Sequence, residues 1–229
     1  MAEARINANE TARSECPHCG AQAGGAHFCP DCGKIQPVKA GTDYFAFFGL
    51  PRKLALDEAA LEKNFYSLSR QLHPDYFMNA TGAERQSSIE RSSMLNDAYR
   101  ALREPVSRAK YLLSLEGFKE AEKKSPPPDL LEEVFELNMQ VEELKAAKKM
   151  GDDGEVSEAR TALEDALQGL KEKLNQIDER LFALFADWDK AVDLIAGDAE
   201  RKAALDQMSE LLSHRSYIRN LVRDIKEEL

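Results

Sequence analysis

The amino-acid sequence predicts an all-α protein with a small metal-binding segment before its first helix. Apolar residues recur at spacings of three and four over most of the chain, which is the period of amphipathic helices. Of 229 residues, 43% are hydrophobic and 31% are charged, a composition typical of helix-rich proteins with packed cores. We expect three parts: a tetracysteine segment with its linker at 1–41, a helical hairpin within 42–119 and a three-helix bundle at 126–229.

The four cysteines form two CxxC pairs, Cys16 with Cys19 and Cys29 with Cys32, separated by nine residues. Four thiolates complete a tetrahedral zinc site, and the two-residue gap lets one turn present both sulfurs to one ion. Such a closed site has no open position for catalysis, so we expect structural Zn²⁺. A redox dithiol pair and a rubredoxin-like iron site stay open, whereas disulfides conflict with the cytosolic location inferred below.

Other residues of this segment refine the prediction. Gly20 and Gly33 directly follow the two pairs and allow the backbone to fold tightly beneath a metal. His18 and His27 lie nearby, but four cysteines already fill the site, so we expect neither histidine to be a ligand. The segment lacks a basic patch, which disfavours nucleic-acid binding and favours a platform that contacts a protein partner.

The next part of the chain predicts two amphipathic helices joined by a polar loop. Pro74 lacks a backbone N–H and disfavours helical torsion angles at His73, so the first helix should end near Leu72. Asp43 and Asp57 are the expected N-caps of a short helix and of this longer one. The apolar stripes of the hairpin are Leu61, Phe65, Leu68 and Leu72 in the first helix and Ile89, Leu95, Ala98, Tyr99 and Leu102 in the second.

The loop carries His73-Pro74-Asp75, and the segments Asp43-Tyr44-Phe45 and Phe48-Gly49-Leu50 lie upstream. Together they resemble the J domain of DnaJ-type co-chaperones. The resemblance implies that the loop docks on a DnaK-type ATPase chaperone and stimulates its ATP hydrolysis. Lys63 and Arg70 lie on polar faces beside the loop, where they would meet an acidic partner surface; the alternative is that they are only solvated.

The stretches Asn96–Pro105 and Arg108–Gly117 are more specific and look like the HscB family, the J-type co-chaperones of iron–sulfur cluster assembly. Ordinary DnaJ proteins continue into a Gly/Phe-rich linker at this point, and this chain does not. The resemblance implies a co-chaperone without catalysis of its own, which delivers an IscU-like scaffold protein to an HscA-like chaperone. It is strong through Gly117 and weaker after it, and animal members carry a comparable tetracysteine segment.

A proline-rich joint, Ser125–Asp129, precedes three amphipathic helices separated by Gly151–Gly154 and Gly197–Asp198. The first of these helices is apolar on two sides. One side is the expected core stripe, which comprises Leu130, Val134, Leu137, Val141 and Leu144.

The second apolar side repeats every four residues and predicts a partner surface if it is exposed. Burial of both sides is the alternative. In the HscB family this helix and an aromatic residue of the last helix bind the scaffold. The resemblance places on that face Leu131, Phe135, Glu136, Met139, Glu143 and Tyr217.

The charge distribution limits the partners. The net charge is −10, and residues 126–229 hold 25 acidic and 14 basic side chains. This balance argues against nucleic acid and suits a basic protein partner or a solvated surface. No apolar stretch is long enough to span a bilayer and the first 15 residues lack the apolar core of a signal peptide, so we expect no membrane partner and a cytoplasmic location.

Two other functions stay open from the sequence. A general J protein would deliver unfolded clients, and its bundle would have no affinity for the scaffold. A zinc-ribbon adaptor or redox protein would use the hairpin only as structure. The sequence also leaves open whether the chain forms a homodimer.

Overall fold

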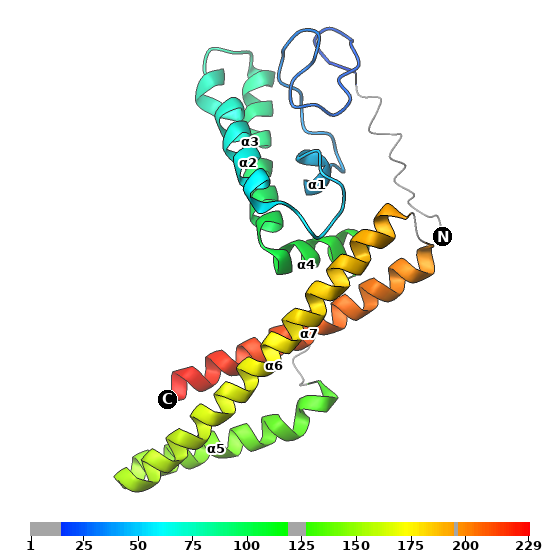
Figure 1. Ribbon diagram of the computed structural model, residues 1–229. Coiled ribbons are helices and arrows are strands. Elements are labelled where there is room, and N and C mark those ends of the chain that lie inside the picture. The colour runs from blue at the N-terminus through cyan, green and yellow to red at the C-terminus, as the bar shows by residue number, and fades with distance from the viewer. Residues whose placement is uncertain (1–14, 119–126, 195–196) are drawn as a thin grey trace. The chain divides into compact units, whose positions relative to one another are not determined.

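The computed structural model describes residues 15–118, 127–194 and 197–229. Within these ranges the regular elements are helices, with two isolated β-bridges near the cysteines, so the all-α prediction is confirmed. No helix of the described ranges is long and apolar enough to cross a membrane. Backbone contacts divide the chain into two compact units: residues up to Arg52 with Leu56–Arg108, and Lys53–Ala55 with Ala109–Leu229 (Figure 1).

The first unit places two cysteine turns before a helical hairpin. The predicted N-caps are confirmed, because the Asp43 carboxylate accepts the Ala46 N–H at 2.8 Å and the Asp57 carboxylate accepts the Ala60 N–H at 3.0 Å. The elements are α1 (Tyr44–Phe47), α2 (Glu58–Leu72), the 3₁₀ helix η2 (Pro74–Phe77), α3 (Gly82–Arg103) and the first residues of α4 (Pro105–Leu115), within which the division between the units falls.

Helices α2 and α3 lie side by side and form the predicted hairpin (Figure 1). Phe65 of α2 stacks on Tyr99 of α3 with ring centroids 4.1 Å apart. The prediction was wrong at Ile89, which is 53% exposed, while Arg91 on the opposite side of α3 is buried. The buried apolar residues of the hairpin are Leu61, Leu68, Leu72, Leu95, Ala98 and Leu102.

The second unit contains three long helices, α5 (Leu131–Met150), α6 (Asp153–Asp193) and α7 (Asp198–Glu228), after the 3₁₀ turn η3 (Pro128–Leu130). The start of the predicted proline-rich joint lies outside the described residues. Helix α6 packs against both α5 and α7, and the short joints between consecutive helices make each pair antiparallel.

Apolar side chains and ion pairs join the three helices. Lys173 of α6 pairs with Glu133 of α5, Arg215 of α7 pairs with Asp178 of α6, and Lys145 of α5 lies 3.2 Å from Glu228 of α7. The core of the unit includes Leu137, Leu144, Leu163, Leu170, Ile177, Leu181, Phe185, Trp188, Leu205, Met208, Leu212, Ile218 and Ile225.

The second unit also holds the short segment Lys53–Ala55. Asp189 of α6 is 9% exposed, and its carboxylate accepts the backbone N–H groups of Leu54 and Ala55, each at 2.7 Å. Lys53 forms an ion pair with Asp193 at 2.6 Å. The buried Asp189 carboxylate therefore has two hydrogen-bond donors, which a buried charge requires.

Candidate functional site

The loop between α2 and α3 displays His73, Pro74 and Asp75. Helix α2 ends at Leu72 as predicted, and His73 has extended backbone angles (φ −60°, ψ 130°) because Pro74 follows it. Pro74 then starts the 3₁₀ turn η2, where its missing N–H costs no hydrogen bond. Local sequence thus determines where α2 ends and where the turn η2 begins.

The side chains of His73 and Asp75 point to solvent. Their exposed fractions are 52% and 77%, and the His73 Nδ1 lies 3.5 Å from the Asp75 carboxylate. The Asp75 backbone N–H donates to the same Nδ1 at 3.3 Å. This bond helps to fix the orientation of the imidazole. Exposure on this scale suits contact with a partner and does not suit a buried acid–base pair.

The base of the loop is fixed by two residues that the sequence analysis missed. Ser88 and Ser92 of α3 both donate their hydroxyl groups to the Leu72 carbonyl, at 2.7 and 2.8 Å. Their spacing of four places both hydroxyl groups on one face of α3. The last carbonyl before His73 is therefore anchored from the opposite helix, although serines in a polar helix give no signal of this role in sequence.

Lys63 and Arg70 both lie exposed on α2, the helix that leads into the loop. Neither forms an ion pair with another residue in the part of the chain that the structure describes. Tyr76 and Met78, which follow the tripeptide, are 74% and 68% exposed. The loop and its flanks thus combine cations with uncovered apolar surface.

The second candidate site is the tetracysteine cluster. The sulfur atoms of Cys16, Cys19, Cys29 and Cys32 all lie within 4.8 Å of one another, and none forms a disulfide. The Cys16–Cys32 and Cys19–Cys29 sulfur separations are both 3.7 Å. A tetrahedral ion with bonds of about 2.3 Å to sulfur requires edges of about 3.8 Å, so the four cysteines fit such an ion.

Each cysteine pair lies on a tight turn. The Gly20 N–H donates to the Cys16 carbonyl at 2.8 Å, and the Gly33 N–H donates to the Cys29 carbonyl at 3.0 Å. Both glycines have positive φ, 74° and 69°, a conformation that other residues adopt only with strain. The sequence pattern predicted this requirement for glycine.

Hydrogen-bond donors support the thiolate form of Cys16. Burial works against the charge, but the backbone N–H groups of His18 and Cys19 and the Gln36 amide outweigh it and lower the pKa of Cys16 to about 6. The Gln36 Nε2 lies 3.4 Å from the Cys16 sulfur. These donors suit a sulfur that ligates a cation.

The neighbouring histidines contribute no ligand to the cluster, which contains the four cysteines alone among the described residues. His18 is exposed, whereas His27 is part of a contact with α3 that the sequence analysis did not anticipate. The His27 Nδ1 accepts a bond from Arg91 at 2.7 Å. Burial, aided by the Arg91 charge, lowers the pKa of His27 to about 4, so its ring is neutral at pH 7 and can accept this bond.

The third candidate surface lies on α5. Leu131, Phe135 and Met139 have exposed fractions of 53%, 66% and 50%, whereas Leu137 and Leu144 on the other side of the helix are buried. Glu136 and Glu143 are exposed beside them. We call the three apolar residues the α5 strip. Tyr217 lies on α7 and is half-buried, and burial raises the pKa of its hydroxyl.

Comparison with known proteins gives the fold. No family model matches the chain. The human co-chaperone protein HscB is similar in structure over 94% of this chain and 98% of its own, with a TM-score of 0.59 and 23% identity. The chaperone HscB from Vibrio cholerae is similar over 81% of this chain and 96% of its own, with a TM-score of 0.53 and 23% identity. The chain therefore has the HscB fold.

Proposed function

We propose that the chain is a J-type co-chaperone of iron–sulfur cluster assembly. The observation that carries the proposal is the exposed His73-Pro74-Asp75 loop at the joint of a helical hairpin, in a chain that has the HscB fold over 94% of its length. The chain would hold a cluster scaffold protein and bring it to a DnaK-type ATPase chaperone in the cytoplasm. The chemistry, ATP hydrolysis, belongs to the partner.

The loop would contact the ATPase chaperone. The Asp75 carboxylate is 77% exposed and is suited to a charge-assisted bond with an arginine of the partner. Lys63 and Arg70 would add steering toward an acidic surface. Ser88 and Ser92 would contribute indirectly, because they hold the carbonyl just before His73.

The α5 strip would bind the scaffold protein. Three apolar residues at spacings of four give one continuous exposed stripe, which is the arrangement that a partner with an apolar patch requires. Glu136 and Glu143 would pair with basic residues at its rim, and Tyr217 would contribute an aromatic edge.

The tetracysteine cluster would hold a structural Zn²⁺. The sulfur geometry fits a tetrahedral ion, and four thiolates leave no position for substrate. When bound, zinc supplies four bonds that stabilise a segment with few buried apolar residues. The cysteines themselves would bind and orient, and they would take no part in ATP hydrolysis.

We expect Phe135→Ala to weaken binding of the iron–sulfur scaffold protein by about 30-fold, because a central apolar contact is typically worth about 2 kcal/mol. Met139→Ala should weaken it less, by about fivefold, because Met139 lies farther along the strip and is less exposed. Isothermal titration of the full chain with the purified scaffold measures both.

Met150→Ala is the matched control, because Met150 is 79% exposed on the same helix but lies about 16 Å beyond Met139 along the helix axis, at the end of α5. It should leave the affinity for the scaffold unchanged. Equal affinities for native protein, Phe135→Ala and Met139→Ala would contradict the assignment of this face. No binding by the native protein, together with stimulation of the ATPase, would favour the general J protein.

A further inference from the structure

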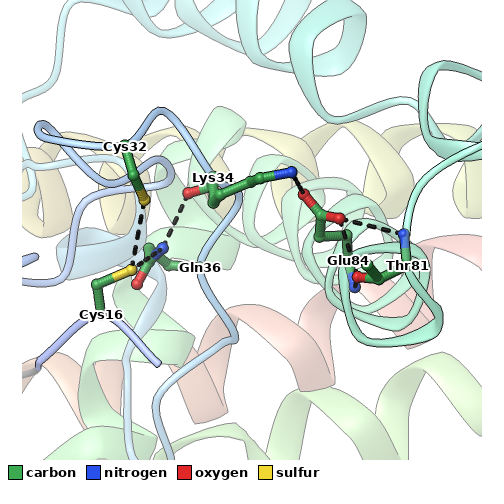
Figure 2. Close-up of polar contacts among 6 residues, drawn as sticks. All are labelled: Cys16, Cys32, Lys34, Gln36, Thr81 and Glu84. Atoms are coloured by element: carbon green, nitrogen blue, oxygen red, sulfur yellow. Dashed lines mark hydrogen bonds and ion pairs between the residues drawn. The ribbon is translucent and has the colours of Figure 1, made fainter. Parts of the chain in front are cut away.

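The tetracysteine cluster is connected to the same turns of α3 that hold the His73 loop. Figure 2 shows part of this connection, which runs from Cys16 through Gln36 and Lys34 to Glu84 at the start of α3. The individual bonds decide what the connection can do.

The first connection reaches the N-terminus of α3. The buried Gln36 donates its Nε2 to the Cys16 sulfur at 3.4 Å and to the Lys34 carbonyl at 2.8 Å. The Lys34 ammonium lies 2.8 Å from the Glu84 carboxylate. Glu84 closes the capping box of α3, because its carboxylate accepts the Thr81 N–H at 3.1 Å while the Thr81 hydroxyl accepts the Glu84 N–H at 3.3 Å.

The Glu84 carboxylate is held by these bonds. The Lys34 ammonium and the two Thr81 donors lower the pKa of Glu84 to about 2. Thr81 is the N-cap residue of α3. Lys34 of the cysteine segment thus contacts the capping box with which α3 begins after the loop.

The second connection is stronger and uses Arg91. This side chain is 4% exposed, and burial lowers the pKa of its guanidinium to about 10, so it remains charged at pH 7. Its acceptors all belong to the cysteine segment or its linker: the Gln36, Ala26 and Pro37 carbonyls and the His27 ring. The guanidinium also lies 6.0 Å from the centre of the Phe47 ring.

A buried guanidinium requires its acceptors. Leaving such a charge without partners is strongly destabilising, since desolvation is no longer offset. The carbonyls that satisfy Arg91 are presented by a segment whose own buried cluster consists of Cys16, Ala23 and Cys29, with Ala21 and Cys32 packed against it. So small a cluster cannot maintain its shape without the metal.

Both connections end on residues that flank the contacts of the His73 loop. Ser88 lies one turn before Arg91, and Ser92 is the residue directly after Arg91. These two serines donate hydrogen bonds to the Leu72 carbonyl. The turn η2 also packs on α3. Loss of the acceptors of Arg91 would therefore disturb the turns of α3 that anchor the start of the loop, and loss of the Lys34–Glu84 ion pair would disturb the turn that follows the loop.

We propose that metal binding by the four cysteines orders the first turns of α3 and thereby holds the His73 loop in place, with Lys34, Gln36 and Arg91 as positioning residues. The coupling is reciprocal, so an ordered α3 raises the metal affinity by the same factor. The consequence for ATPase stimulation rests on the proposed function, whereas the coupling itself does not.

Hydrogen exchange of the full chain tests the coupling, with zinc bound and after zinc has been removed by a chelator. We expect amides of 81–92 to exchange about 5- to 150-fold faster without zinc, the range of ordinary coupling between sites. Amides of α6 should exchange equally in both samples and serve as the internal reference. Equal exchange of 81–92 in both samples would overturn the proposal.

Arg91→Met separates coupling from simple packing. A purely structural role for Arg91 would speed exchange of 81–92 equally with and without zinc. The proposal predicts that the zinc-dependent difference itself shrinks and that zinc affinity falls by about 5- to 150-fold. Arg100→Met is the control, because Arg100 lies on the same helix with its side chain 75% exposed and its pairing partner, Asp97, is also on α3. An undiminished zinc-dependent difference in Arg91→Met would overturn the assignment.

Lys34→Met provides a second variant if Arg91→Met does not fold, since the Lys34 side chain is 42% exposed and its loss breaks one ion pair. It should reduce the zinc-dependent difference most at 81–85. The ATPase assay is kept separate. An exchange difference without ATPase stimulation by the zinc-loaded chain would contradict the proposed function, and stimulation without an exchange difference would contradict the coupling.

Discussion

Replacing His73 by glutamine is expected to abolish stimulation of the partner ATPase and to leave the fold intact. The imidazole is 52% exposed, and its hydrogen bond in the structure comes from the neighbouring Asp75 N–H. Surface substitutions of this kind change stability by about 0.5 kcal/mol or less. A central contact of an interface is worth about 2 kcal/mol or more, so stimulation at subsaturating concentration should fall at least about 30-fold.

Steady-state ATP hydrolysis by a purified DnaK-type chaperone of the iron–sulfur pathway measures the effect. His18→Gln is the matched control, because His18 is also exposed and contributes its backbone rather than its side chain to the cysteine cluster. The control should stimulate like the native protein. Full stimulation by His73→Gln would show that the loop is not the contact and would contradict the proposed role of the tripeptide.

Replacing Cys29 by serine is expected to have the largest effect on stability. Cys29 is 2% exposed and lies in the small buried cluster of the segment. Structural zinc sites release about 10–16 kcal/mol on binding in small peptides, and a hydroxyl group in place of one thiolate forfeits much of that free energy. The native chain should contain one zinc ion, and Cys29→Ser should contain far less and be cut by protease within 15–41.

Metal content by elemental analysis and limited proteolysis check this prediction together. Asp31→Asn is the control within the same turn, because Asp31 is exposed and lies outside the sulfur cluster. It should retain full zinc and full protection. Stoichiometric metal in Cys29→Ser would contradict the four-thiolate site, and iron in the native protein would replace zinc as the metal while leaving the site in place.

The elements that local chemistry determines could be predicted from sequence. Pro74 ends α2 because its ring removes the backbone N–H and restricts the preceding residue. Asp43 and Asp57 cap their helices by accepting the backbone N–H three residues later. The spacing of the cysteines predicted their convergence, because each pair needs only one turn. These features depend on residues close in the chain.

The contacts that join distant segments could not be predicted. Arg91 reaches carbonyls more than 50 positions earlier in the chain, and a charged residue in an amphipathic helix gives no sign of such a contact in sequence. Ile89 was expected in the apolar stripe, but it is 53% exposed, because the period of α3 alone does not say which of its faces another segment covers. The contacts of Arg91 depend on a partner segment that covers a polar face of the helix.

The α5 strip can bind a partner only if its side chains are exposed, and the apolar period of a helix does not determine which of its sides is exposed. A helix that is apolar on two sides can bury both, and the structure buries Leu137 and Leu144 while Phe135 remains 66% exposed. The scaffold as its partner remains a proposal, for which the fold and the exposed apolar stripe are the support.

The most direct test of the central claim is ATP hydrolysis by the DnaK-type chaperone with this protein and the iron–sulfur scaffold added separately and together. The account predicts that the two together stimulate more than the sum of their separate effects, and that either His73→Gln or Phe135→Ala removes this excess. Stimulation by the native protein that the scaffold does not change would contradict a scaffold-specific co-chaperone. No stimulation under any of these conditions would contradict a co-chaperone of this ATPase.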